Sequence, residues 1–355
     1  MAKNPTQLEE LQNINIESEM MAFNGTKKAF RAPLSSLTNV LNAGNLKMPG
    51  SDKTIAEYYR YMSGKQMLIN ADFEKPINQR SQTTYPAAGN AYIIDCWNAQ
   101  NAAVRLDSDG IVFEGGNGFN QSVEFPEKFL GKTITLSALV TENSAEGNFG
   151  PNTAVNAFNH SQWPAGYMSF DKNTAPGLWT ITGKLPDSMP SGHTHLNFGM
   201  WFLKNERLKI RAMKLEFGDH QTLAHREGNK WVLNDPPPNY ALELAKCQRY
   251  FIRVGNSGLS DSAQAVVAFA NAANTTHAAF HLPLPVTMRS RPAIAFKNVA
   301  LRTGIKDIEA TPAGFSGITY NGVYTGANVE SGLIQGNTYM VRCMNGGYID
   351  LDANL

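Results

Sequence analysis

Most of the chain alternates apolar and polar residues with the two-residue period of β-strands. Between residues 65 and 233, the short apolar runs are rich in β-branched and aromatic residues, and they read MLINADFE, GIVFEG, TITLSALVTEN, GYMSFD, LWTITGKL, HLNFGMWFL and LKIRAMKLEFG. In the third run the pattern places Ile134, Leu136, Ala138 and Val140 on one face. In the last it groups Leu208, Ile210, Ala212 and Lys214. Many short strands without strand–helix alternation predict a β-sandwich or jelly roll.

Residues 1–64 have a different, helical pattern. LSSLTNVLNAG spaces its apolar residues like a helix that ends at Gly44, and TIAEYYRYMSG opens with Thr54 and Glu57 at capping-box spacing. Few apolar residues precede Leu34, so we expect this segment to pack on another chain or a larger assembly. The alternative is a disordered leader with a small helical cap.

The chain changes character again at residues 234–249. NDPPPNY forms a stiff spacer, and Asn239 is placed to cap a helix from about Tyr240 to Arg249. YFIRV then alternates as a strand, and 250–355 reads as a second β-sandwich. The predicted fold is therefore mainly β, with two jelly-roll-like sandwiches, a short linking helix and a small helical N-terminal attachment segment.

Composition narrows the classes of function. The net charge of +1 gives no reason to expect a nucleic-acid partner. The three cysteines, Cys96, Cys247 and Cys343, are far apart, which predicts free buried thiols rather than disulfides or a zinc site. The N-terminus has no apolar signal-peptide region and no apolar run spans a membrane, so we expect synthesis in a cytoplasm without membrane insertion.

The order of several short motifs resembles a family of bacteriophage tail-fibre or receptor-binding proteins that join a carbohydrate-binding-module-like jelly roll to a C-terminal tip domain. The motifs are LINADFE with NQR, YIIDCW, MKLEFG, ELAKCQRYF, FHLPLPVTMRSRPAI and YIDLDANL. The matching positions are Leu68, Ile69, Asn70, Asp72, Phe73, Gln79, Arg80, Asp95, Trp97, Lys214, Leu215, Glu216, Gly218, Cys247, Gln248, Arg249, Tyr250, Pro285, Met288, Arg289 and Pro292. The resemblance covers roughly residues 67–355 and implies a homotrimer on a virion that recognises, or supports a domain that recognises, a host surface glycan. Residues 1–64 lie outside it and are expected to dock onto other virion proteins.

The predicted helix offers a trimer interface. Ala241, Ala245 and Cys247 are small enough for close approach around a threefold axis, and Gln248 and Arg249 could hydrogen-bond between chains. In the alternative, this helix closes the end of the C-terminal sandwich in a monomer.

The best glycan-binding candidate is the polar stretch NAFNHSQWPAGYMSFD. Trp163 and Tyr167 could stack on a sugar, with Asn159, His160 and Gln162 beside them as hydrogen-bonding groups. Alternatively, Trp163 folds back onto the sandwich. A separate set of tryptophans lies within strand-like runs and is expected in the core or on a sheet face: Trp97, Trp179 and Trp201.

No metal, cofactor or catalytic site is expected. His193 and His195 share one strand face but have no third ligand at suitable spacing. LDSDG, with Asp107 and Asp109, lacks the rest of a calcium loop and predicts a tight hairpin turn. No catalytic motif is present. The sequence therefore gives no support to an enzyme, and the resemblance implies a virion protein, a trimeric tail fibre or receptor-binding protein. The alternatives are a head fibre or baseplate adaptor without a receptor role, and a secreted carbohydrate-binding module.

Overall fold

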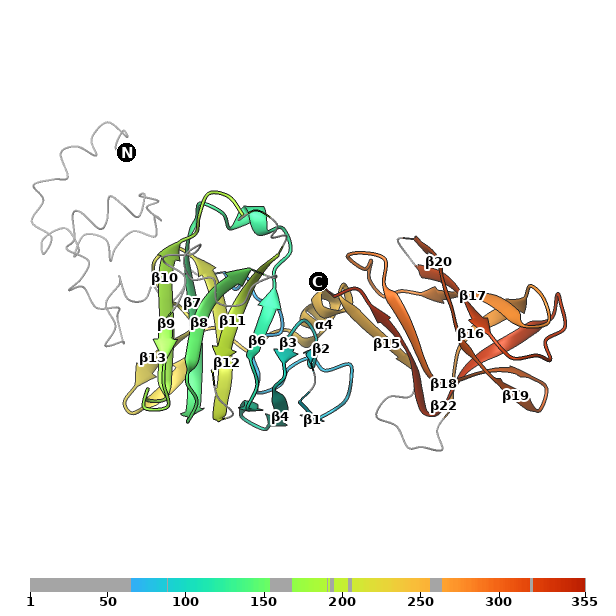
Figure 1. Cartoon of the computed structure of the whole chain (residues 1–355), viewed down its shortest axis with the longest axis horizontal. Coiled ribbons are helices and arrows are strands. Elements are labelled where there is room, and N and C mark those ends of the chain that lie inside the picture. The colour runs from blue at the N-terminus through green and yellow to red at the C-terminus, as the bar shows by residue number, and fades with distance from the viewer. Residues whose placement is uncertain are drawn as a thin grey trace, which may run out of the picture. The chain divides into compact units, whose positions relative to one another are not determined.

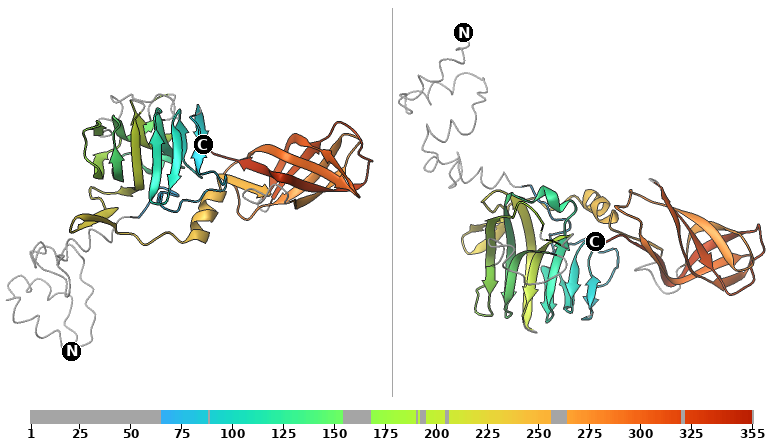
Figure 2. Two further views of the ribbon diagram at one scale, coloured as in Figure 1. Left: turned by 90° about the horizontal axis from the view of Figure 1, so that it is seen from below. Right: turned by 45° about the horizontal axis from the view of Figure 1, so that its top comes forward.

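A computed structural model describes residues 65–87, 89–153, 168–189, 191, 195–203, 206–255, 264–319 and 322–354. These belong to one unit, Lys65–Leu355, which is mainly β with sandwich-like domains and a single described α-helix (Figures 1 and 2). The predicted fold class is confirmed. LDSDG forms the tight hairpin turn that the sequence predicts, because only Ser108 and Asp109 connect two paired strands.

Two six-stranded antiparallel sheets form the N-terminal sandwich. The first sheet has the order β1 (Thr84–Tyr85), β4 (Ala103–Asp107), β5 (Gly110–Glu114), β12 (Arg207–Phe217), β7 (Thr133–Asn143) and β10 (Gly177–Lys184). The second has the order β2 (Asn90–Tyr92), β3 (Asn98–Gln100), β6 (Gly118–Ser122), β11 (Leu196–Phe202), β8 (Gly147–Thr153) and β9 (Met168–Phe170). A short 3₁₀ helix, Pro126–Lys128, follows β6.

Aromatic side chains fill the space between the two sheets. Trp97 stacks on Phe119 with ring centroids 4.5 Å apart, and Phe73 meets Trp97 edge-on at 5.1 Å. Trp179 belongs to the same core, while Trp201 is buried on the opposite face of β11. The prediction that these tryptophans occupy the core or a sheet face is confirmed.

The outward face of the first sheet is covered by the chain itself. The predicted inward set of β7, from Ile134 to Val140, lies in the core, but Thr135, Ser137 and Leu139 on the other face are buried too. The hairpin β13 (Ala224–Glu227) and β14 (Lys230–Leu233) packs there, with Trp231 and Leu233 against Leu139.

The predicted alternation of β12 is wrong in its second half. Leu208 and Ile210 face the core, but Ala212 packs under the hairpin on the outer face. The pairing register with β7 shifts on both sides of Ile210, so a β-bulge there leaves Arg211 unpaired as an extra residue and reverses the facing from Ala212 onward. Lys214 is consequently on the outer face as well.

A second prediction also fails, because MLINADFE forms no regular strand. It makes only an isolated bridge between Asp72 and Ala212, and Asn70 adopts a left-handed φ of 56°.

The helix and the strand that follow the three prolines agree with the sequence prediction. Helix α4 (Tyr240–Gln248) begins at Asn239, whose side chain accepts a hydrogen bond from the Leu242 backbone N–H at 3.2 Å. Strand β15 (Phe251–Gly255) follows. The described helix is too short to cross a membrane.

The C-terminal region is one eight-stranded antiparallel sheet around a separate core. Seven strands have the order β19 (Lys306–Glu309), β18 (Ala293–Thr303), β22 (Thr338–Asp352), β16 (Ala265–Ala272), β17 (His277–Pro283), β21 (Gly322–Asn328) and β20 (Thr311–Thr319). Strand β15 pairs with the last residues of β22, and β18 also contacts β20, so the sheet curls around its core.

Candidate functional site

The glycan-binding residues predicted from sequence, Asn159, His160, Gln162, Trp163 and Tyr167, lie outside the described residues. Their segment joins β8 to β9, which are neighbouring strands of the second sheet. The prediction therefore stays a prediction, and it directs attention to the face of that sheet.

The outward face of the second sheet carries a concentration of amide side chains. Strand pairing places Asn98 beside Asn120, and Asn120 beside Gly199. Trp201 pairs with Asn148 on the next strand. We call the set formed by Asn98, Gln100, Asn120, Asn148, Asn197 and Trp201 the amide face.

Simple alternation produces this face. In GFNQS and LNFGMWF, the phenylalanines of β6 and β11 point into the core, so the residues between them must point outward. Neither run can be shifted by one residue without exposing Phe119 and Phe198, which fixes the amides on the outer side.

Two of these amides have an unmatched polar atom. Asn98 is 7% exposed and Asn120 is 3% exposed, yet Oδ1 of Asn98 and Nδ2 of Asn120 have no hydrogen-bond partner among the described residues. Their neighbours are paired, since Asn197 Oδ1 accepts from Ser122 Oγ at 2.5 Å. A buried polar atom without a partner costs about 1–3 kcal/mol, so the row formed by Asn98 and Asn120 holds one unused acceptor and one unused donor at the expense of stability.

The amide face is also free of charge in its described part. Its remaining outward residues are Asn90, Tyr92, Gly118, Ser122, Gly150, Ser169 and Gly199. The first sheet is the opposite case, because Lys209 Nζ on its outer face lies 2.5 Å from Asp109 and 3.4 Å from Asp107. A ligand on the amide face is therefore expected to be polar and uncharged.

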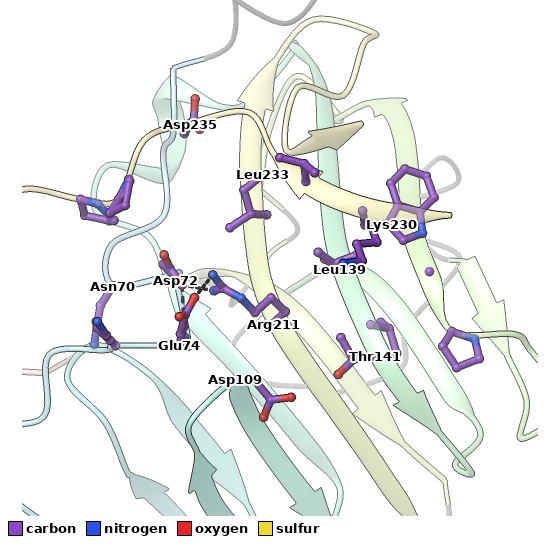
Figure 3. Close-up of a pocket in the computed structure, with 18 of the residues that line it drawn as sticks. Asn70, Asp72, Glu74, Asp109, Leu139, Thr141, Arg211, Lys230, Leu233 and Asp235 are labelled. Atoms are coloured by element: carbon purple, nitrogen blue, oxygen red, sulfur yellow. Dashed lines mark hydrogen bonds and ion pairs between the residues drawn. The ribbon is translucent and has the colours of Figure 1, made fainter. Parts of the chain in front are cut away.

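A groove of about 990 Å³ lies over the first sheet, bordered by the β13–β14 hairpin and the linker to α4 (Figure 3). Arg211, which faces outward at the β12 bulge, points to Asp72 and Glu74 and pairs with both. Lys214 Nζ likewise pairs with Asp235 at 2.5 Å. These charges are matched within the chain, and the groove has no comparable unmatched polar atoms, which makes it the weaker site.

Asp95 is a fully buried carboxylate near the junction. Burial raises its pKa to about 6, although Arg80 Nη1 at 3.2 Å and Gln79 favour the charged form. Arg80 also lies 3.7 Å from Asp352 and stacks on the Phe251 ring. Asp95 has this structural network around it and no adjoining pocket in the described residues, so we assign it no catalytic role.

The predicted trimer-interface residues differ in how exposed they are and in whether they have partners within the chain. Cys247 is fully buried in the core of the N-terminal sandwich, where a hydrogen bond with the Cys96 thiol and burial raise its pKa. Arg249 Nη2 pairs with Glu124 of the same chain at 3.1 Å. Ala241 is exposed, and Ala245 and Gln248 are half-buried. Cys247 is therefore the one member of the set with no accessible surface, and the interface stays a prediction.

The three cysteines are free and buried, as predicted. His193 lies outside the described residues, so the His193–His195 pair stays untested. Within the described ranges, no group of three or more histidine, cysteine or acidic side chains is arranged to hold a metal ion.

The fold defines a mainly β protein built of sandwich-like domains. No family model matches the sequence, and neither does any curated protein. The chain is similar in structure to the N-terminal CBM22-1–CBM22-2 tandem domain of Xyn10C from Paenibacillus barcinonensis, at 11% identity and a TM-score of 0.27, over 82% of this chain and 90% of that one. A similarity this weak carries no argument about function.

Proposed function

We propose that the protein is an attachment subunit that binds a neutral glycan on the amide face. The observation that supports this is the unmatched pair of polar atoms on Asn98 and Asn120. A sugar hydroxyl both donates and accepts hydrogen bonds, so neighbouring hydroxyls can satisfy an amide oxygen and an amide nitrogen together. A hydroxyl is also small enough to reach a nearly buried amide, and the absence of charge among the described residues of the face disfavours acidic sugars.

Two other classes of ligand fit this face less well. A peptide would bring backbone groups too large for nearly buried amides, and an anion would find neither a cation nor a helix N-terminus among the described residues of the face. Catalysis has no support in the same place, because the described residues of the face include no carboxylate, imidazole or thiol that could act as acid, base or nucleophile.

The virion role belongs to the same proposal. The motif order over residues 67–355 supports a homotrimeric phage tail fibre or receptor-binding protein, made in the host cytoplasm and attached through residues 1–64. The second candidate is a head fibre or baseplate adaptor in which the sandwich is only a spacer. The near-complete burial of Asn98 and Asn120 favours that candidate.

A glycan array probed with the full chain tests the proposal. We expect binding to neutral oligosaccharides that Asn98→Leu removes, with Ser137→Ala as the matched control. Ser137 also has a buried, unpartnered hydroxyl, but it lies under the hairpin on the first sheet. Binding to acidic glycans alone, no binding at all, or equal loss in the control would each reject the amide face. Labelling the chain in particles for cryo-electron microscopy separates fibre from head or baseplate, and light scattering measures the trimer.

A further inference from the structure

The C-terminal sheet carries aromatic rings on its outward face, away from its core. On β17 the outward residues are His277, Ala279 and His281, and on β21 they are Gly322, Tyr324, Gly326 and Asn328. His281 pairs with Tyr324, and Phe269 lies on the adjoining strand β16. We call the set formed by Phe269, His277, His281 and Tyr324 the ring platform.

The two imidazoles lie across glycines of the neighbouring strand. A Cβ atom at position 326 would lie 2.5 Å from Cε1 of His277, and one at position 322 would lie 2.0 Å from Nε2 of His281. Neither glycine has a left-handed φ that would require glycine for its backbone. The space that the missing side chains leave is what allows both rings to rest on the sheet.

The other two rings are exposed although they stand on inner strands of the sheet. Phe269 is 65% exposed and Tyr324 is 48% exposed, while β16 and β21 each have strands on both sides. Burying such a side chain contributes about 1.5–3 kcal/mol, so the described fold leaves that stabilisation unused at both positions. Exposed aromatic residues grouped in this way are typical of binding surfaces rather than of solvent-facing sheets.

The polar neighbours of the rings are amides and a hydroxyl, while the charged side chains on the same outward face, Arg302, Arg342 and Asp307, pair with one another. His277 Nδ1 lies 3.0 Å from Asn328 Oδ1, and Asn271 Oδ1 accepts from Thr338 Oγ1 at 2.9 Å. Ala279 and Gly326 pair between them, which leaves a low floor between the His277 end and the Tyr324 end of the platform. His277 and His281 are four residues apart on one strand, a span of about 13 Å, which is too far for one metal ion.

We propose that the ring platform is a second glycan-binding site, independent of the amide face, that takes an uncharged oligosaccharide. Flat, exposed rings match the apolar C–H face of a sugar, and the flanking amides and hydroxyl match its hydroxyl groups. The charged side chains on this face are engaged with one another, which favours a neutral chain over an acidic one. His277 stands apart from the row formed by Phe269, His281 and Tyr324, and this spacing suits several linked sugars rather than one.

The test uses the full chain and an array of neutral oligosaccharides built from glucose, galactose and N-acetylglucosamine. Phe269→Ala and Tyr324→Ala should each weaken binding by tenfold or more, on the order of an interface hot spot. Ile334→Ala is the control, because Ile334 is exposed to a similar degree, at 63%, in the same sheet domain but off the platform. All three variants should keep the wild-type melting temperature.

The outcomes separate the two glycan sites. Binding that survives Asn120→Leu but is lost in Phe269→Ala supports the platform and rejects the amide face. Binding that is abolished by Asn120→Leu and unchanged in Phe269→Ala and Tyr324→Ala rejects the platform and leaves the proposed function intact. A wild-type chain that binds no neutral glycan rejects the platform. Loss of an oligomer in Phe269→Ala, measured by sedimentation, also rejects it, because that result assigns the rings to contacts between copies of the chain.

Discussion

Replacing Asn120 by leucine should separate binding from stability. The Asn120 side chain is 3% exposed and its Nδ2 has no partner in the described part of the chain, so the folded chain bears a desolvation cost of about 1–3 kcal/mol for that amide. Leucine has nearly the same volume and nothing to leave unsatisfied. Changes of shape at a packed site usually cost less than about 1.5 kcal/mol. The net expectation is an unfolding free energy that is unchanged or raised by up to about 1–2 kcal/mol.

Thermal unfolding and glycan binding should be measured on one preparation of the full chain. For a domain of this size, 1 kcal/mol corresponds to about 2–4 °C in melting temperature, so the gain is measurable. Neutral-glycan binding should fall at the same time. A loss of 2 kcal/mol or more in unfolding free energy would refute the reasoning, because it would show that the Asn120 amide is satisfied in the folded chain and serves the fold rather than a ligand.

The remaining predictions concern charge and packing. Asp95 has a folded pKa of about 6 against an ordinary 3.8, so its ionisation costs the folded state about 3 kcal/mol above pH 6 and nothing below pH 3.8. The unfolding free energy of Asp95→Asn, measured relative to wild type by guanidinium titration, should therefore be higher at pH 7 than at pH 4. An equal difference at the two pH values would contradict the raised pKa. Asp235→Ala should lower the unfolding free energy by about 1–3 kcal/mol, because it leaves the Lys214 ammonium buried without a partner. Lys214→Met removes the buried charge itself and should stay within about 1 kcal/mol of wild type. A larger loss in Lys214→Met than in Asp235→Ala would show that the ion pair is itself stabilising. Gly326→Ala should displace the His277 ring and reduce glycan binding on the array with little change in melting, and unchanged binding would remove this ring from the platform.

Short-range sequence signals predicted helix α4 and strand β15 well. Three consecutive prolines, an asparagine in position to cap and a change of period at residue 250 are all short-range features, and α4 and β15 begin where these features place them. The β4–β5 hairpin was predictable for the same reason. The inward set of β7 followed from alternation alone, but its buried outer face did not, because the covering hairpin comes some ninety residues later in the chain.

Features that depend on strand pairing could not be predicted in this way. A bulge adds one residue without changing composition, so the alternation of β12 read correctly up to Ile210 and wrongly afterwards. The amide face was missed because Asn98 and Asn120 are 22 positions apart and meet only through the register of β3 with β6. A signal was present in the amides that alternate with phenylalanine in FNQS and LNF, which marks an outer face that is polar yet carries no charge.

The two outer faces of the N-terminal sandwich show why the unmatched amides point to function. On the first sheet the chain covers the surface with its own hairpin, and Lys209, Arg211 and Lys214 each have a carboxylate partner, so that the small Ser137 hydroxyl beneath the hairpin is left unmatched but no charge is. The same chain leaves an acceptor on Asn98 and a donor on Asn120 without partners, although an apolar residue at either position would remove the cost. A stability penalty that substitution could so easily remove is expected to persist where the polar atoms bind something outside the chain. The C-terminal sheet departs from the most stable arrangement in a different way, because its exposed aromatic rings leave the stabilisation from burial unused. Both departures from the most stable arrangement are uncharged, and that shared property is why we propose a neutral glycan for each.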